Sequence, residues 1–266
     1  MLKKTFFKIG KYIVPHGKIF SPNQLDVMLV SYPKSGNTWV RALVAHLIAD
    51  EPSLSDMEKL IPDIYKANGR VLNNAYVFNS GGRLLKSHES FNPKYKKIIY
   101  IARDPRDVCV SYYHYKKKIN KLLFEDGIDK FVDSYLAGKL DSFGTWSEHI
   151  KSWECAEEVE RLFLRYEDIV DEPVEELKKV ADFLGIKVSE KQLCMAVDQC
   201  KIDNLRAKEK SERRSWRELK NSDKDGSFFR VGGSNNWSEL SKLSCNKIEE
   251  KWGGEMEKLG YSISSY

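Results

Sequence analysis

The segment VSYPKSGNTW, residues Val30–Trp39, carries the strongest signal for chemistry in the chain. An apolar stretch leads into a short polar turn, and a helical pattern follows directly. The free backbone N–H groups at the start of a helix lie at the positive end of its dipole and bind anions well. Gly36 permits close approach of the backbone, Lys34 adds a positive charge, and short polar donors complete the turn, namely Ser35, Asn37 and Thr38. The pattern predicts an anion site, and an ordinary capped turn is the alternative.

This turn differs from the Walker A loop of nucleotide hydrolases. That loop has the pattern GxxxxGK[ST], in which Lys and a hydroxyl residue follow the last glycine. Here Lys34 precedes Gly36, and no hydroxyl residue stands in the usual place to hold Mg²⁺. Metal-assisted hydrolysis of a nucleotide is therefore disfavoured.

A second polar turn follows the apolar stretch of YIARDPRDVCVSYYHY, residues Tyr100–Tyr115. Arg103 stands at the end of the predicted strand, and Ser111 lies about two helical turns further along. The guanidinium of arginine offers a rigid fork of donors, which suits a phosphate group when a hydroxyl lies nearby. The sequence therefore indicates a phosphate site, with a structural Arg–Asp ion pair as the alternative.

A third polar group ends the segment LLKSH, residues Leu84–His88. Lys86 and His88 stand at the expected carboxyl edge of a strand, where open α/β sheets bind their ligands. A neutral histidine, with an ordinary pKa of about 6.5, accepts a proton readily near neutral pH. His88 is thus a candidate general base, although a lone histidine is often only structural.

Apolar runs without alternation predict the buried strands that must position these groups. The runs are Asp26–Tyr32, Arg83–Lys86, Lys97–Ala102 and Arg161–Arg165. Helical patterns lie between and after them, at Thr38–Ala49, Arg106–Lys117, Trp146–Val159, Pro173–Leu184 and Ser189–Gln199. Strands that alternate with helices predict an α/β fold with a central, mostly parallel sheet flanked by helices. The stretch Asn68–Gly82 is expected to be a loop.

Length and charge limit the possible classes of protein. The chain has 266 residues, 44 Lys and Arg against 39 Asp and Glu, and a net charge of +5. This small excess among many charges of both signs excludes a histone-like polycation and gives no reason to expect nucleic acid as a partner. The five cysteines form no CxxC pair, so we expect free thiols in a reducing compartment, no zinc site and a cytoplasmic location.

The amino-terminal residues are expected to form an arm over 1–22. The stretch is basic and mildly apolar, but it lacks the uninterrupted apolar core of a signal peptide. A weak peripheral contact with a membrane is one interpretation of its lysines together with Phe6, Phe7 and Ile9. No apolar run reaches the ~18–20 residues of a transmembrane helix.

Taken together, these motifs resemble the cytosolic-type sulfotransferases, which use 3′-phosphoadenosine-5′-phosphosulfate (PAPS). In family order, PKSGNTW is similar to the 5′-phosphosulfate loop, KSH to the catalytic-histidine segment and RDPRDVCVSYYHY to the 3′-phosphate motif. Further matches are GTWSEHIKSW, RYEDIVDEPVEELKKVADFLG and FFRVGGSNNW, so the resemblance runs from Asp26 to Trp237. It implies a single domain over 1–266 with the sulfotransferase fold, which is similar to P-loop nucleotide-binding proteins.

The resemblance also implies roles for individual residues. His88 would be the general base, Lys34 would stabilise the leaving oxygen, and Lys86 would assist at the transferring group. Lys34 and the other cofactor-binding residues would hold PAPS, and then its product PAP, without a metal. These other residues are Ser35, Gly36, Asn37, Thr38, Trp39, Arg103, Ser111, Tyr166, Cys200, Phe228, Phe229, Arg230, Val231 and Gly232. In this set Trp39 and Tyr166 would hold the adenine, while Arg103 and Ser111 would grip the 3′-phosphate.

The chain departs from the family at several of these positions. Val231 stands where the family often has lysine, which removes one cation from the 3′-phosphate clamp. Cys200 begins the stretch Cys200–Ile202 where many members have Thr-Ser-Phe, so adenine contacts there differ. The dimerisation segment of vertebrate members has no clear counterpart in 242–266, so the sequence leaves the oligomeric state open. The charged segment 206–226 is either a mobile lid over an anionic ligand or a solvated helix or loop.

Two other functions remain as alternatives to a sulfotransferase. A P-loop-like kinase would require a GK[ST] motif and a carboxylate for Mg²⁺, and neither is evident in the sequence. An inactive nucleotide-binding scaffold is opposed by the presence of Lys34, Lys86 and His88. The acceptor of the sulfuryl group would be a hydroxyl or an amine of a small molecule, a lipid or a glycan. Candidate aromatic residues for lining its pocket are Tyr65, Tyr76, Phe78 and Phe124.

Overall fold

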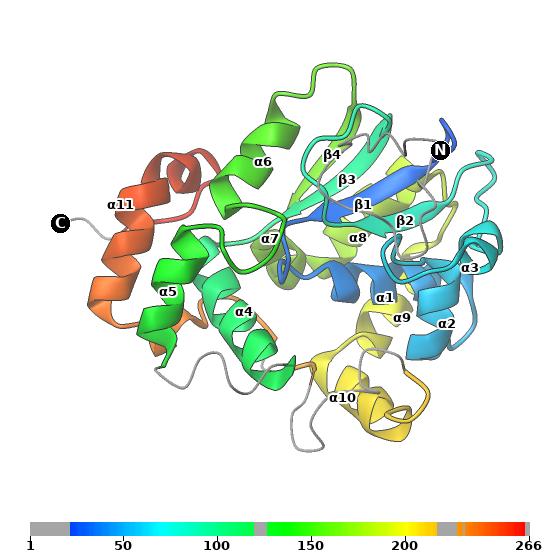
Figure 1. Ribbon diagram of the computed structural model, residues 1–266. Coiled ribbons are helices and arrows are strands. Elements are labelled where there is room, and N and C mark those ends of the chain that lie inside the picture. The colour runs from blue at the N-terminus through cyan, green and yellow to red at the C-terminus, as the bar shows by residue number, and fades with distance from the viewer. Residues whose placement is uncertain (1–21, 120–126, 217–227, 231, 264–266) are drawn as a thin grey trace, which may run out of the picture.

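The computed structural model describes residues 22–119, 127–216, 228–230 and 232–263 (Figure 1). The expected amino-terminal arm over 1–22 therefore lies almost wholly outside the described residues. The expected lid over 206–226 is described only as far as Trp216.

A parallel sheet of four strands forms the centre of the described structure. The strands are β1 (Val27–Ser31), β2 (Leu84–Ser87), β3 (Lys97–Ala102) and β4 (Glu160–Arg165), in the order β2-β1-β3-β4. Every neighbouring pair is parallel. The four strands predicted from apolar runs are thus confirmed, as is the α/β class. All four carboxyl ends meet at one edge of the sheet.

Helices connect the strands and cover both faces of the sheet. The helices are α1 (Asn37–Ile48), α2 (Leu54–Leu60), α3 (Gly69–Asn73), α4 (Pro105–Ile119), α5 (Ile128–Leu136), α6 (Trp146–Glu154), α7 (Tyr166–Asp171), α8 (Pro173–Leu184), α9 (Glu190–Gln199), α10 (Ile202–Ser211) and α11 (Lys242–Lys258). A 3₁₀ turn, η2, spans Trp237–Glu239.

Two sequence predictions about helices were wrong in detail. The helix expected over Trp146–Val159 ends at Glu154, because the chain must turn there to enter β4. The stretch expected to be a loop over Asn68–Gly82 contains α3. The side chain of Asn68 caps this helix by accepting a hydrogen bond from the Val71 N–H at 3.0 Å.

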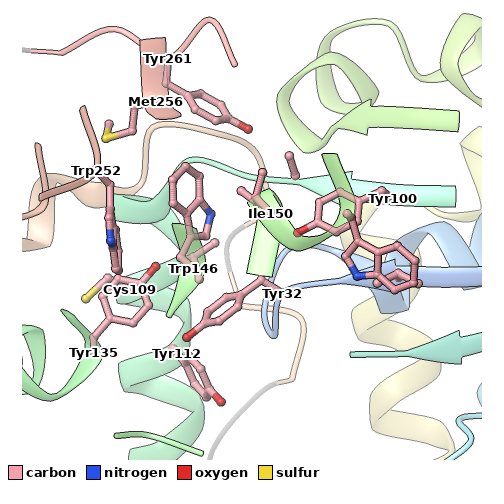
Figure 2. Close-up of a cluster of buried hydrophobic side chains, with 14 of the residues drawn as sticks. Tyr32, Tyr100, Cys109, Tyr112, Tyr135, Trp146, Ile150, Trp252, Met256 and Tyr261 are labelled. Carbon is pink, nitrogen blue, oxygen red and sulfur yellow. The ribbon is translucent and has the colours of Figure 1, made fainter. Parts of the chain in front are cut away.

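One face of the sheet packs against α4, α5, α6 and α11. Met28, Val30 and Tyr100 point from the strands into this cluster, where all three are fully buried. Figure 2 shows Trp146 of α6 beside Trp252 of α11, and their ring centroids lie 5.6 Å apart. Aromatic side chains thus join the carboxy-terminal helix to the sheet.

The opposite face packs against α1, α2, α8 and α9 (Figure 1). Leu29, Ile99 and Ile101 alternate with the residues of the first face, as strand geometry requires. Burial on both faces explains why the strands appear in the sequence as continuous apolar runs.

All five cysteines are free thiols. In the described part of the chain, no helix combines the length and apolar character needed to cross a bilayer.

Candidate functional site

The candidate site lies at the carboxyl edge of the sheet. Each strand is followed closely by a residue that the sequence singled out, namely Lys34 after β1, His88 after β2, Arg103 after β3 and Tyr166 after β4. After β1 the chain crosses over to form β2 on one side of β1, and after β2 it returns to form β3 on the other side of β1. Such a switch in strand order opens a crevice where open α/β sheets bind ligands.

The turn between β1 and α1 holds an unusual backbone. Gly36 has φ +96° and Lys34 has φ +72°, both in the left-handed region. A Cβ atom on Gly36 would lie only 2.3 Å from Cδ2 of Tyr166. The turn thus requires glycine at this position, and it brings the start of α1 against the Tyr166 ring.

The start of α1 is suited to an anion. Gly36 is the N-cap residue and supplies no side-chain hydrogen bond, and the first turn contains no acidic residue. The Ser35 hydroxyl is buried and has no hydrogen-bond partner among the described residues. A buried hydroxyl beside the positive end of a helix fits a bound phosphate or sulfate group.

The Lys34 ammonium lies over two aromatic rings. Its Nζ is 4.5 Å from the ring centroid of Tyr115 on α4 and 4.9 Å from that of Phe228. These cation–π contacts hold the charge above the polar turn. Tyr115 belongs to the motif after β3, but the sequence did not indicate its contact with Lys34.

Arg103 joins the turn after β1 to the late segment at Gly233. Its Nη1 donates to the Lys34 carbonyl and its Nη2 to the Gly233 carbonyl, both at 3.3 Å. Nη2 also lies 3.5 Å from Asp107, so the predicted alternative of an Arg–Asp pair is present. The buried Nε has no partner among the described residues, which leaves a donor of the guanidinium for an anion.

Tyr166 lies between Arg103 and Trp39. The guanidinium carbon of Arg103 is 4.1 Å from the Tyr166 ring centroid, and the Trp39 and Tyr166 rings meet edge to face at 5.7 Å. Trp39 Nε1 donates to the Cys200 carbonyl at 3.1 Å. The structure therefore brings Arg103 and Trp39 together on the Tyr166 ring, and it links Trp39 to a fourth predicted cofactor residue, Cys200.

His88 is held by the end of β1. Its Nδ1 lies 2.7 Å from the Ser31 carbonyl oxygen. A carbonyl only accepts, so Nδ1 carries the hydrogen and Nε2 keeps a lone pair. The imidazole also meets the ring of Phe143 edge to face at 5.5 Å. This tautomer is the one that a general base acting through Nε2 requires.

Burial keeps His88 neutral. Desolvation, followed by the charge of Lys86, holds the His88 pKa well below the ordinary value of histidine. His149 on α6 donates from Nε2 to the His88 carbonyl at 3.1 Å and accepts from the Tyr100 hydroxyl at 2.8 Å. Burial lowers the pKa of His149 to about 4, so it too is neutral. No pattern in the sequence indicated this support.

Lys86 lies in a buried ion pair. Its Nζ is 2.6 Å from Asp63 Oδ2, and both side chains are less than a tenth exposed. The expected role for Lys86 at the transferring group is therefore not evident in its contacts. Asp63 follows α2 in a stretch with no motif, so no sequence signal identified it.

Side chains of α10 form hydrogen bonds with the backbone of the late segment that contains Phe228, Phe229 and Arg230. Both oxygens of buried Glu209 accept backbone N–H groups, from Phe228 at 2.5 Å and Phe229 at 3.0 Å. Arg206 donates to the Phe229 carbonyl at 3.0 Å. The segment thus places the Phe228 ring beside Lys34.

The remaining members of the late segment lie elsewhere or are not described. Arg230 forms an exposed ion pair with Glu239 at 2.8 Å. Gly232 accepts from the Asn236 amide at 3.1 Å. Val231 lies outside the described residues. Ser111 lies one helical turn beyond Asp107 on α4, and no contact between Ser111 and Arg103 is evident.

The arrangement suits a ligand with several anionic groups and an aromatic base. Lys34, Ser35 and the start of α1 surround one polar region, and Arg103 adjoins it through the Lys34 carbonyl. Among the described residues, no group of three or more His, Cys, Asp or Glu side chains is placed to hold a metal ion.

Comparison with known proteins supports this interpretation. Residues 24–259 match the family model of the sulfotransferase domain. Flavonol 3-sulfotransferase of Flaveria bidentis is 33% identical over 88% of this chain and 84% of its own. Human sulfotransferase 1C2 is 27% identical over 90% of this chain and 85% of its own.

The fold is also similar to a solved structure, mouse sulfotransferase SULT7A1 in complex with PAP. That structure has a TM-score of 0.67 at 24% identity and covers 89% of this chain and 85% of its own. The predicted fold and the predicted family are both confirmed. From the match over residues 24–259 we conclude that the chain belongs to the sulfotransferase-domain family.

Proposed function

We propose that this chain transfers a sulfuryl group from PAPS to the hydroxyl of a small apolar acceptor, with His88 as the general base. As a member of the family, the chain is a PAPS-dependent sulfotransferase that releases PAP. The observation that carries the finer proposal is the tautomer of His88, whose Nδ1–H is bound to Ser31 at 2.7 Å and whose Nε2 keeps its lone pair.

PAPS supplies the sulfuryl group. In the proposed reaction, the acceptor oxygen forms its bond to sulfur while the bond from sulfur to the bridging phosphate oxygen breaks. His88 Nε2 takes the proton of the acceptor hydroxyl, and the leaving electron pair remains on the bridging oxygen of PAP. In-line transfer of this kind depends on positioning and charge stabilisation, as phosphoryl transfer does.

Two elements are proposed to stabilise the developing negative charge. Lys34 presents its ammonium at the turn after β1, and the N–H groups at the start of α1 add the field of the helix. Arg103, supported on the Tyr166 ring at 4.1 Å, would hold the 3′-phosphate. Trp39 adjoins the same ring and would lie against the adenine.

Aromatic rings near His88 favour a flat apolar acceptor. Phe143 meets His88 at 5.5 Å, and Tyr65 meets Phe143 at 5.8 Å. Of the other predicted lining residues, Phe78 is buried in the core and Tyr76 packs edge to face on it. Phe124 lies outside the described residues. A phenol or apolar alcohol therefore fits this surface better than an acidic glycan.

Labelled PAPS tests this function directly. We expect label to pass to phenols and apolar alcohols, and His88→Gln to abolish the transfer while PAP still raises the melting temperature. Transfer mainly to glycans or charged lipids would overturn the acceptor class. Stabilisation by ATP and Mg²⁺ in preference to PAP would instead favour a kinase. Binding of PAP without transfer to any acceptor would indicate an inactive scaffold.

The location in the cell is a separate proposal. The five free thiols fit a reducing compartment, and we propose the cytoplasm.

A further inference from the structure

The ion pair between Lys86 and Asp63 lies near the end of β2, just before the candidate general base in the chain. Lys86 is on β2, two residues before His88. Its ammonium is 2.6 Å from Asp63 Oδ2, and the side chains are 9% and 7% exposed. Two charges removed from water to this extent interact strongly with each other and with any nearby titratable group.

Asp63 is fixed by backbone and side chain together. A parallel β-bridge pairs it with Lys86, through hydrogen bonds from Lys86 N to the Pro62 carbonyl at 2.9 Å and from Ile64 N to the Lys86 carbonyl at 3.1 Å. Asp63 Oδ1 accepts from the Tyr65 N–H at 2.9 Å. The carboxylate is therefore held in one place at the edge of β2.

The charged and titratable groups that act on His88 come from three elements. Lys86 on β2 lowers the His88 pKa, and Asp63 in the loop after α2 raises it. His149 on α6 lowers it slightly but stays neutral itself, because burial lowers its own pKa to about 4. Lys66 acts on Asp63, whose pKa is held below its usual range by Lys86 and Lys66 against the effect of burial.

We propose that Asp63 is a positioning residue for sulfuryl transfer, which anchors the Lys86 ammonium and balances its charge beside His88. The inference rests on the proposed function of His88 as the base. Lys86 was expected to assist at the transferring group. In this proposal, Lys86 instead helps to set the basicity of His88.

The two members of the pair should act on His88 in opposite directions. Lys86→Met leaves the Asp63 charge unbalanced, so the His88 pKa should rise. The acid limb of the pH profile of kcat/KM should then move upward by about one pH unit. Adding Asp63→Asn to Lys86→Met removes that charge and should return the limb to its wild-type position. Asp63→Asn alone should weaken the base and lower turnover without moving the limb upward.

Asp26→Asn supplies the matched control. Buried Asp26 forms an ion pair with the partly exposed Arg83, 2.5 Å apart, at the amino ends of β1 and β2. Loss of the Asp26 charge should lower the melting temperature and leave the pH profile of kcat/KM unchanged. A merely structural role for Asp63 would give the same result as this control.

Nuclear magnetic resonance gives a second readout that needs no turnover. The His88 ring resonance, identified by its loss in His88→Gln, should titrate at higher pH in Lys86→Met than in the double variant. The double variant keeps no unbalanced buried charge, so the comparison survives if Asp63→Asn alone is unstable. Equal titration of His88 in both variants would overturn the proposal. Absence of transfer by the wild type would refute the proposed function separately.

Discussion

Replacement of Gly36 by alanine tests the turn that joins the sheet to the anion site. Gly36 has φ +96°, and a Cβ there would lie 2.3 Å from Cδ2 and 2.6 Å from Cε2 of Tyr166. An L residue in the left-handed region costs about 1–2 kcal/mol by itself. The contact distances also force the Tyr166 ring to move, because real Cβ atoms do not approach a ring so closely.

Movement of Tyr166 should weaken nucleotide binding. The ring supports Arg103 at 4.1 Å and contacts Trp39 at 5.7 Å. Loss of one cation–π contact and one aromatic contact together amounts to about 2 kcal/mol. That free energy corresponds to a roughly 30-fold rise in the Kd of PAP. Titration calorimetry with PAP measures this change.

Gly185→Ala is the control for backbone strain. Gly185 also has a positive φ, +70°, but a Cβ there would meet no atom within 4 Å, and the residue ends α8 away from the site. This variant should lose stability in urea and bind PAP as the wild type does. Wild-type PAP affinity in Gly36→Ala would refute the assignment of this turn to the nucleotide.

Three further predictions concern individual side chains. Arg103→Lys keeps the charge but loses the planar fork, so the Kd of PAP should rise about 10-fold or more; an unchanged Kd would show that Arg103 does not bind the nucleotide. His88→Gln should lower kcat by about 100-fold or more while PAP still stabilises the protein, and wild-type turnover would rule out His88 as the base. His149 has its pKa lowered to about 4 by burial, so the unfolded chain takes up the proton first as the pH falls. Titration of His149 should therefore lower the free energy of unfolding by roughly 2 kcal/mol between about pH 7 and pH 5. Burial also lowers the pKa of His88, which adds a further drop, so urea melts in which His149→Gln loses as much stability as the wild type would contradict this.

The sheet and its carboxyl edge could be predicted from the sequence, because strands buried on both faces are continuous apolar runs. Each strand is a short apolar run, and each run ends in a polar group such as Lys34 or Arg103. Parallel strands bring those ends to one edge, so the positions of Lys34, His88 and Arg103 at that edge followed from the motifs. The tautomer of His88 did not follow, since it depends on the Ser31 carbonyl of a neighbouring strand.

Contacts between side chains that lie far apart in the sequence could not be predicted in this way. Asp63 meets Lys86 across 23 positions of sequence, and Glu209 meets Phe228 across 19. Neither carboxylate belongs to a motif, and an exposed acidic residue would look the same in the sequence. Short helices such as α3 were missed for a similar reason, because a single cap at Asn68 starts a helix within a stretch rich in turn residues.

Transfer of label from PAPS by the wild type and by His88→Gln, both saturated with PAPS and supplied with the same phenolic acceptor, tests the role of His88 most directly. We predict label on the acceptor with the wild type and none above background with His88→Gln. Equal transfer by the two proteins would contradict the assignment of His88 as the general base.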